Sequence, residues 1–513
     1  MDRALTPSDY TPAQRKLHRR LEHVPAALVW VTLAGAVVLS VLNPMAAVYL
    51  IIAFDLYWFL RVLYFVIFLT TAWRRHRGAL DVDWESSLKD APGAAKLRHL
   101  IFLPTYKEDI EILRATFRSL VAAKADPKTI IVVLAGEERA GREAFLERAE
   151  TIRREFGERF LRFVVSAHPS DIVGEIAGKG SNLHHAGPIA RKTVDELGIP
   201  YEDVIVSTFD VDTIAHPQYF AHLAKTYLET PDRLRCSYQP VVLYSNNIWD
   251  APAIVRIAAF GTTFWLLSEL VRPDRLFTFS SHSMPFKALV DVGFWQRDVV
   301  SEDSRIFLQC FLKYDGDYRV VPLYVPVSMD AVMAPTWLGS LMNLYKQQRR
   351  WAWGVEHFPY LVLNFRANRK IPAAKRRSTL WNLSEGMYTW ATAPVLIFIL
   401  GWLPLFIADT TGRSEAVFQN APFTLQWIMS FAMLGVFVSA VLSLPLLPAR
   451  PAHKRSWLHA VMLLQWMLLP FTFIIFGSVP AIEAQTRLLL GKRLGFWVTP
   501  KHVSQKQEVK SRT

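Results

Sequence analysis

The chain has 513 residues, of which 51% are hydrophobic and 17 are tryptophan, and its mean hydropathy is +0.18. A composition this apolar excludes an ordinary soluble enzyme, and the net charge of +13 is typical of cytoplasmic loops that face anionic lipid. Cys236 and Cys310 are the only cysteines, so the sequence offers neither a disulfide framework nor a cysteine-based metal site. No zinc finger, RNA-binding signature or basic repeat indicates a nucleic-acid partner.

Two apolar stretches near the N-terminus, Ala26–Leu42 and Ala46–Thr71, are each long enough to span a bilayer. Basic residues precede the first stretch and follow the second, which predicts a transmembrane hairpin over residues 24–77 with both ends in the cytoplasm. Asp55 and Arg61 lie inside the second stretch. Because charged groups are costly in lipid, we expect both side chains to face other helices.

Short β-branched runs alternate with charged helical segments from residue 98 to about residue 229. The strands expected from this pattern are Leu100–Leu103, Ile130–Leu134, Phe160–Val165 and Val204–Phe209, and the helices are Glu108–Ala123, Glu137–Phe156 and Gly180–Leu197. This alternation predicts a mainly parallel sheet with helices on its faces. No GxGxxG follows the first strand, so a Rossmann dinucleotide site is not indicated. Mixed α/β character continues beyond residue 230, with a late strand expected at Tyr318–Val327.

The last third of the chain is again apolar. Residues 336–366 are amphipathic and rich in Trp, Tyr, Lys and Arg, which predicts a helix in the membrane interface. Further membrane segments are expected at Ala391–Ala408 and Phe423–Leu447. The final segment, Trp457–Ala484, has basic residues at both ends and Pro470 midway, so a bent or re-entrant segment is favoured over a simple span.

Two carboxylates, Asp210 and Asp212, follow the strand expected at Val204–Phe209. Open α/β sheets bind ligands at the C-terminal ends of their strands. Paired hard oxygen ligands suit Mg²⁺ or Mn²⁺, which can in turn hold a diphosphate. The same spacing recurs without a preceding apolar strand at two places that we expect to be solvated turns, Asp81/Asp83 and Asp315/Asp317.

Two loops could contribute to a nucleotide site. The residues of Pro104–Glu108 offer hydroxyl, aromatic and carboxylate groups that can surround a nucleobase and ribose; the alternative is a plain strand-to-helix turn. Gly178–Gly180 could present Lys179 and a helix N-terminus to phosphate, or be a glycine loop with a solvated lysine. The neighbouring His184 and His185 are expected to be structural, because adjacent residues on a helix point in different directions.

Two further groups of residues carry reactive or binding chemistry. Glu302 and Asp303 follow an apolar run and can supply a general base or cap a helix. Gln347, Arg350 and Trp351 share one helical face by their spacing. A planar cation suits a diphosphate and an aromatic plate suits a sugar ring. An interfacial anchor helix would explain the Trp and Arg but not the Gln.

The order Asp-x-Asp, Glu-Asp, Gln-x-x-Arg-Trp between membrane helices resembles the family 2 glycosyltransferases, and within them the cellulose synthase, chitin synthase and hyaluronan synthase branch. Phe496–Lys501 is similar to the Phe-x-Val-Thr-x-Lys gating loop of cellulose synthases. The resemblance covers residues 98–360 by its motifs and the membrane helices only in layout. It implies an α/β fold, a GT-A-like glycosyltransferase domain with a mainly parallel sheet, inserted between transmembrane helices.

The resemblance also implies a donor site and a metal site. The nucleotide-sugar contacts would come from Thr105, Tyr106, Glu108, Lys179, Asp210, Gln347, Arg350, Thr499 and Lys501. Asp212 together with Asp210 would hold Mg²⁺ or Mn²⁺. The acidic family motif after the second strand is replaced here by Leu134–Glu138. The Asp that usually recognises uracil is therefore missing unless Glu137 or Glu138 substitutes for it, and the identity of the base stays open.

On the acceptor side, the resemblance assigns Asp303, beside Glu302, as the base that deprotonates the acceptor hydroxyl. Trp351 would stack on the acceptor sugar. Ser281 and His282 belong to a stretch that occupies the place of the family's acceptor-side loop, although its amino-acid sequence differs from the family's.

The resulting prediction is a processive inverting glycosyltransferase in the inner membrane, with its catalytic domain in the cytoplasm. It would transfer sugar from a nucleotide-sugar, with a UDP-sugar favoured, to a growing polysaccharide. Alternatives are a non-processive enzyme that makes a glycolipid, a nucleotide-sugar-binding transporter subunit, and an inactive scaffold. The expected partners are a carbohydrate or lipid acceptor and membrane lipids, with no nucleic acid. The expected divisions are a polar N-terminus (1–23), the hairpin (24–77), the catalytic domain (98–335), interfacial helices (336–380), C-terminal transmembrane or re-entrant helices (381–484) and the gating-loop-like end (485–513).

Overall fold

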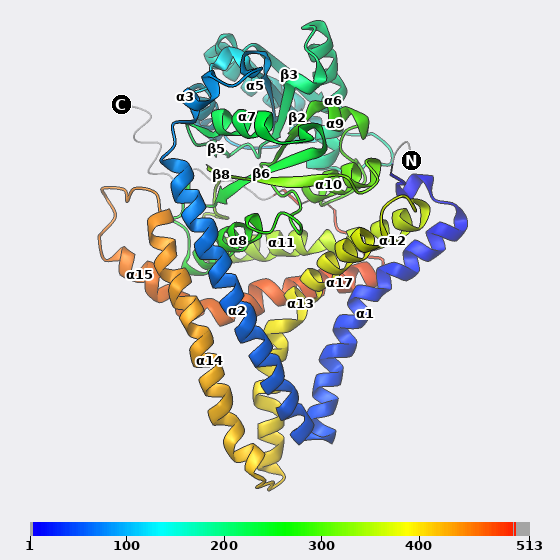
Figure 1. The fold of residues 1–513 in the computed structure, drawn as a ribbon, viewed down its shortest axis with the longest axis vertical. Coiled ribbons are helices and arrows are strands. Elements are labelled where there is room, and N and C mark those ends of the chain that lie inside the picture. Colours follow the sequence, from blue (N-terminus) through cyan, green and yellow to red (C-terminus); the bar gives the residue numbers. More distant parts are fainter. Residues whose placement is uncertain (1–3, 496, 499–513) are drawn as a thin grey trace.

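The computed structural model describes residues 4–495 and 497–498. An α/β body lies at one end of the molecule, and four long helices extend from it and converge at the opposite end (Figure 1). These helices are α1 (Pro12–Leu42), α2 (Pro44–Leu80), α13 (Ala373–Thr410) and α14 (Ala416–Ser443). The first two are joined directly at Asn43, so the helical hairpin is confirmed, and the side of the membrane on which it begins stays a prediction.

Eight strands form one sheet in the order β3-β2-β1-β4-β7-β6-β8-β5. The strands are β1 (Arg98–Pro104), β2 (Ile130–Glu137), β3 (Arg162–His168), β4 (Val204–Thr208), β5 (Ile214–Ala215), β6 (Cys236–Leu243), β7 (Ser283–Pro285) and β8 (Arg319–Ser328). The first four strands in sequence are mutually parallel, as predicted. Their carboxyl ends therefore meet at the same edge of the sheet. The far half is mixed, because β7 runs antiparallel to β4 and β6 while β6 and β8 are parallel.

The helices of the α/β body are α3 (Trp84–Lys89), α4 (Ile110–Val121), α5 (Arg142–Phe156), α6 (Lys179–Glu196), α7 (Tyr219–Glu229), α9 (Phe286–Asp291) and α10 (Glu302–Lys313). Every position of β2 and of β4 is buried, which explains their continuous apolar runs.

Two predicted helix starts were wrong. Glu137 belongs to β2, because it pairs with His168 of β3, and α5 begins only after Gly141, which has a positive φ of 102°. Residue 108 precedes α4, whose N-cap is Asp109. In both cases, residues that favour helices occupy the strand or turn before the helix. Strand pairing and the position of the N-cap, and not residue preference, set the first residue of each helix.

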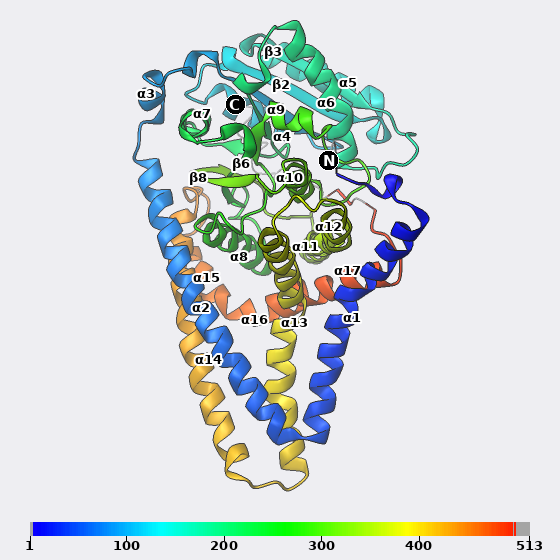
Figure 2. The same cartoon turned by 45° about the vertical axis from the view of Figure 1, so that its right-hand side comes forward.

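A layer of helices lies between the sheet and the membrane-type ends of the long helices (Figures 1 and 2), and the end of α2 also reaches β8, where His76 Nδ1 lies 2.7 Å from the carbonyl of Tyr324. It contains α8 (Ala253–Leu270), α11 (Trp337–Ala352) and α12 (His357–Ala367). Below it, α15 (Leu458–Leu464), α16 (Leu469–Phe473) and α17 (Val479–Leu489) run across the long helices in Figure 2. Pro470 and a π-turn at Ile474–Ser478 interrupt this last run, so the segment is bent, as predicted.

By length and composition, six helical segments among the described residues are suited to crossing a membrane, which is consistent with a membrane protein. They are the four long helices, α8 and the interrupted α15–α17 run. The apolar window of α8 is mostly buried inside the protein, so α8 packs as part of the body.

Asp55 and Arg61, the two charged residues within the apolar stretch of α2, contact other parts of the protein, as predicted. Asp55 is only 4% exposed. The guanidinium of Arg61 lies 2.8 Å from the carboxylate of Glu385 on α13. Pairing of this kind lowers the cost of placing charge among apolar helices.

Candidate active site

Lys179, the first residue of α6, lies at the centre of an acidic cluster. Its Nζ donates to Asp210 Oδ1 at 2.8 Å and to both oxygens of Asp303 at 2.9 and 3.1 Å. The carboxylate of Glu302 is 3.6 Å away. Lys179 is 8% exposed, which contradicts the alternative of a solvated lysine in a glycine loop. Three of the residues singled out in the sequence thus converge on one ammonium group.

Burial and charge oppose each other in this cluster. Burial alone would lower the pKa of the Lys179 ammonium, but the carboxylates of Asp210, Asp303 and Glu302 raise it above its ordinary value. The pKa of Glu302 is raised by burial and by the adjacent charge of Asp303, against the opposing charges of Lys179 and Arg350. Glu302 is therefore suited to holding a proton while Asp303 and Asp210 stay paired with the lysine.

Asp210 and Asp212 lie in the turn that follows β4, with different surroundings. Ser280 Oγ donates to Asp210 Oδ2 at 2.8 Å. Asp212 is 3% exposed, and its Oδ2 accepts the backbone N–H of Asp330 at 2.9 Å. Asn246 donates to the backbone carbonyl of Asp212 at 3.0 Å. The two carboxylates are thereby fixed at the carboxyl edge of the sheet.

The donor chemistry of this edge suits a hard divalent cation that is shared with a substrate. Among the described residues no group of three or more His, Cys, Asp or Glu side chains could hold a metal. Mg²⁺ is typically held by one or two carboxylates together with substrate phosphates, and Asp210 and Asp212 fit that arrangement. Asp81 lies in a bend and Asp315 in a turn, and Asp83 and Asp317 lie in the irregular segments that follow; three of the four are exposed and Asp315 is half-buried.

The loop after β1 is held together by Glu108. Its Oε2 accepts from Thr105 Oγ1 at 2.8 Å and from the backbone N–H of Tyr106 at 2.6 Å. The ring of Tyr106 has the guanidinium of Arg139 4.7 Å from its centre. Arg139 in turn pairs with Glu137. The loop therefore brings the predicted Thr105, Tyr106 and Glu108 together beside the end of β2.

The two acids at the end of β2 differ in their surroundings. Glu137 is 3% exposed and is linked to the Tyr106 ring through Arg139. Glu138 pairs instead with Arg142 of α5 at 2.5 Å. Of the two candidates for the missing acidic residue, Glu137 is the one that belongs to the loop cluster.

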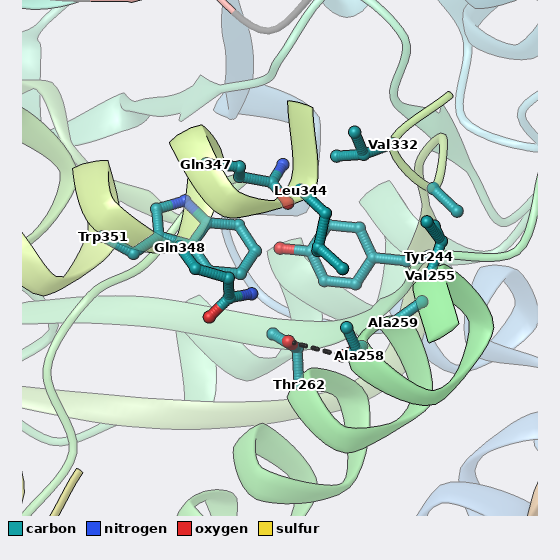
Figure 3. A pocket seen from close by; sticks show the side chains of 11 residues that line it. Tyr244, Val255, Ala258, Ala259, Thr262, Val332, Leu344, Gln347, Gln348 and Trp351 are labelled. Carbon is teal, nitrogen blue, oxygen red and sulfur yellow. Dashed lines mark hydrogen bonds between the residues drawn. The ribbon is translucent and has the colours of Figure 1, made fainter. Parts of the chain in front are cut away.

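A cavity lies between α8 and α11, next to the turn that carries Asp330 (Figure 3). Its walls are formed by Tyr244, Val255, Ala258, Ala259, Thr262, Ala331, Val332, Leu344, Gln347, Gln348 and Trp351. In Figure 3 the hydroxyl of Tyr244 points into the space beside Gln347 and Trp351, and the rings of Tyr244 and Trp351 are 6.1 Å apart. Gln347 and Trp351 thus line one cavity, whereas Arg350, predicted on the same helical face, is not part of its lining.

In the acceptor-side loop, Ser281 and His282 are both fully buried, and His282 Nδ1 lies 4.0 Å from Asp303 Oδ1. Their contact with an acceptor stays a prediction. Ser281 has a positive φ of 64°, and His282 Nδ1 lies 2.9 Å from the carbonyl of Phe279. These contacts turn the chain so that Ser280 reaches Asp210.

Thr499 and Lys501 lie outside the described residues, so their predicted contact with the nucleotide stays a prediction. Trp497 is described, and Lys346 of α11 lies 5.5 Å from the centre of its ring. His184 is structural, as expected: its Nδ1 lies 2.7 Å from the carbonyl of Trp295.

Sequence reasoning missed Tyr244, Asp330 and Gln348, and it placed Ser280 in the acceptor-side stretch without its contact to Asp210. Tyr244 follows the apolar strand β6 directly, so the rule that identified Asp210 after β4 could have found it. Ser280 and Asp330 carried no comparable signal, because a side chain or amide that supports an aspartate from a distant loop is recognised only by its contact.

The structure thus combines an α/β domain that carries Asp210 and Asp212 after β4 with helices suited to crossing a membrane. The family described as Glycosyl transferase family group 2 matches residues 205–479, which is more than half of the chain, and the protein belongs to that family. The match begins in β4, immediately before Asp210, and includes Asp303 and the Gln347–Trp351 motif.

Among solved structures, the mannosyltransferase PcManGT from Pyrobaculum calidifontis in complex with GDP-Man and Mn²⁺ is 15% identical, with a TM-score of 0.42 over 75% of this chain and 99% of its own. Residues 1–349 of S. aureus TarS in complex with UDP-GlcNAc are 12% identical, with a TM-score of 0.35 over 68% of this chain and 91% of that one. No curated protein matches the sequence.

Proposed function

We propose that this protein transfers a sugar from a nucleotide-sugar donor to an acceptor hydroxyl, with inversion at the anomeric carbon. The observation that carries the proposal is the convergence of Lys179 on Asp210 and Asp303 at the edge of the sheet. Asp210 belongs to the donor side, and Asp303 is 22% exposed in its side chain, so the base remains accessible. Family membership supplies the reaction class.

In this mechanism Asp303 accepts the proton of the acceptor hydroxyl as the oxygen attacks the anomeric carbon. Both of its oxygens are engaged by Lys179 in the absence of substrate. An incoming diphosphate offers the ammonium group a competing anion. We therefore expect donor binding to draw Lys179 toward the phosphates and to release Asp303 for proton transfer.

The diphosphate leaving group needs positive charge. Lys179 and Arg350 both place positive charge near Glu302, and Gln347 lies about one helical turn before Arg350 on α11. A Mg²⁺ or Mn²⁺ ion, when bound by Asp212 with Asp210, would add charge neutralisation at the same group. The nucleoside would be held by Thr105, Tyr106 and Glu108. The base would be recognised by the Arg139–Glu137 pair beside them, and the donor would be a UDP-sugar or a GDP-sugar.

We propose a carbohydrate acceptor and a polysaccharide product. The cavity between α8 and α11 has room for about one water molecule, so its walls must move apart before Trp351 and Tyr244 can stack on a pyranose and Gln347 and Gln348 can bind its hydroxyls. One observation favours a lipid acceptor instead. The α8 wall of the cavity is apolar, with Val255, Ala258 and Ala259. A glycolipid product is therefore the second candidate.

A screen of radiolabelled UDP- and GDP-sugars with membranes containing the protein tests this function, followed by linkage analysis of the product. We expect incorporation from one nucleotide class, at the cytoplasmic face of the inner membrane. A long, alkali-soluble polymer supports processive synthesis, and a product extracted into organic solvent supports a glycolipid. Binding of a nucleotide-sugar without any transfer would overturn the enzyme proposal in favour of a transporter subunit.

A further inference from the structure

The chain between α11 and α12 makes a short 3-10 turn, Trp353–Glu356, that lies against the start of α10. Glu356, 9% exposed, accepts backbone N–H groups with one carboxylate oxygen, from Val300 at 3.2 Å and from Ser301 at 3.3 Å. Its other oxygen accepts the indole N–H of Trp353 at 3.0 Å. Both oxygens of a buried carboxylate are thus used to hold the backbone that leads into α10.

Glu356 fixes the backbone of the two residues that lead into α10. Ser301 occupies the N-cap position of α10, yet its side chain makes no capping hydrogen bond. A carboxylate near a helix N-terminus is also favoured by the helix dipole. Glu356, which lies 55 and 56 residues further along the chain than Ser301 and Val300, therefore binds the backbone just before α10 begins.

The next residue, His357, holds the other end of the same helical turn. Its Nε2 lies 2.8 Å from Ser304 Oγ, and its Nδ1 accepts from Arg305 Nε and Nη2 at 3.1 and 3.0 Å. Burial and the charge of Arg305 lower the pKa of His357 well below its ordinary value, so the neutral ring accepts at Nδ1. Arg305 is fixed further by Gln296 at 2.9 Å and by the ring of Tyr360, whose centre is 3.7 Å from its guanidinium carbon.

These contacts lie on both sides of Glu302 and Asp303. Val300 and Ser301 precede the acidic pair, Ser304 and Arg305 follow it, and all four are held by two consecutive residues of one turn. The turn begins at Trp353, directly after α11 ends, and α11 carries Gln347, Arg350 and Trp351. A displacement of α11 would therefore be transmitted directly to the first turn of α10.

We infer that Glu356 and His357 form a clamp that positions Asp303 relative to Arg350 and Trp351, and that both are positioning residues for the transfer reaction. The inference rests on the proposed role of Asp303 as the base. It assigns the clamp no contact with either substrate. Its effect is on the geometry in which Asp303 meets the acceptor hydroxyl, and a misplacement of about 1 Å in such geometry can cost about 10²-fold in rate.

The test compares three single variants of the full-length protein in membranes, with kcat and the donor KM measured separately. Glu356→Ala should lower kcat by about 10²-fold, because the backbone at Val300 and Ser301 loses its hydrogen-bond acceptor and Asp303 shifts. The donor KM should change less than threefold, because Glu356 makes no contact with the donor. Glu356→Gln should recover most of that loss, since its amide oxygen can still accept from Val300 and Ser301. Asn364→Ala is the matched control: Asn364 is also buried on α12, but its side chain bonds the N-terminal segment at Leu5.

Five outcomes are informative. Loss of kcat in Glu356→Ala with recovery in Glu356→Gln and near-normal turnover in Asn364→Ala supports the clamp. Normal kcat in Glu356→Ala overturns it, as does an equal loss in all three variants, which would reflect general packing. If Asp303→Asn is fully active in the same assay, the proposed base is wrong and the clamp falls with it. If Asp303→Asn is inactive and Glu356→Ala is normal, only the clamp is wrong.

Discussion

The ammonium group of Lys179 donates hydrogen bonds to both carboxylate oxygens of Asp303, at 2.9 and 3.1 Å, across 124 residues of sequence. The lysine begins α6 and the aspartate is the second residue of α10. Both residues lie at helix N-termini. A negatively charged substrate can therefore compete with Asp303 for the ammonium group of Lys179. The first two predictions follow from this contact.

Asp303→Asn should abolish transfer and leave nucleotide-sugar binding nearly intact, because the amide keeps the shape and removes the proton acceptor. Loss of a general base costs about 10²–10⁴-fold in rate. Initial-rate assays and equilibrium binding of the donor measure the two effects. Asp317→Asn, in a turn where Asp317 pairs with Arg235, serves as the control. Wild-type turnover in Asp303→Asn would contradict the assignment.

Lys179→Met should lower both donor affinity and stability. Removal of the ammonium leaves Asp210, Glu302 and Asp303 without their shared counter-charge. The two aspartates are 29% and 22% exposed in their side chains, so water offsets part of the cost, and we expect a loss of about 1–3 kcal/mol. Thermal denaturation in detergent measures it. Lys192→Met, whose side chain is 80% exposed, should leave the midpoint unchanged.

Asp212→Ala should remove the dependence of nucleotide binding on a divalent cation, because the variant lacks one of the two carboxylates at the end of β4. Donor binding is measured with and without chelator, and with Mg²⁺ or Mn²⁺ restored. Asp81→Ala and Asp317→Ala should keep the wild-type chelator sensitivity. Unchanged sensitivity in Asp212→Ala would place the metal elsewhere.

The pairing of Arg61 with Glu385 should contribute to the packing of α2 on α13. In a double-mutant cycle with alanine at each position, we expect a coupling energy of about 1 kcal/mol, measured by thermal denaturation in detergent. The exposed pair Lys192–Glu196 should give a coupling near zero. A coupling near zero at Arg61–Glu385 as well would mean that surrounding packing alone fixes the two helices.

Thr499→Ala combined with Lys501→Ala separates a gating segment from a membrane anchor. If the segment closes over the donor and contacts the diphosphate, the double variant should lose most synthesis while remaining folded and membrane-inserted. Product length and rate are the measurements. Full-length product at the normal rate would identify the segment as an interfacial anchor and weaken the comparison with cellulose synthases.

Local chemistry in the sequence determined the first half of the sheet, the acidic pair after β4 and the placement of the apolar helices. Val204–Thr208 is apolar and β-branched, so it forms a buried strand wherever a sheet can cover it, and the residues that follow must emerge at the sheet edge. Likewise, Asp55 and Arg61 face protein because lipid would not solvate them. These properties depend on neighbouring residues and on solvent, and both can be inferred from sequence.

Only the tertiary structure decided which groups meet. Lys179 could have been solvated and Glu137 could have begun a helix. Contacts with α10 buried the lysine, and pairing with β3 placed Glu137 in a strand. Tyr244, Ser280 and the Glu356–His357 clamp owe their positions to contacts between segments far apart in the chain. Such contacts form because burying the whole core selects one arrangement of elements, and no local pattern encodes that selection.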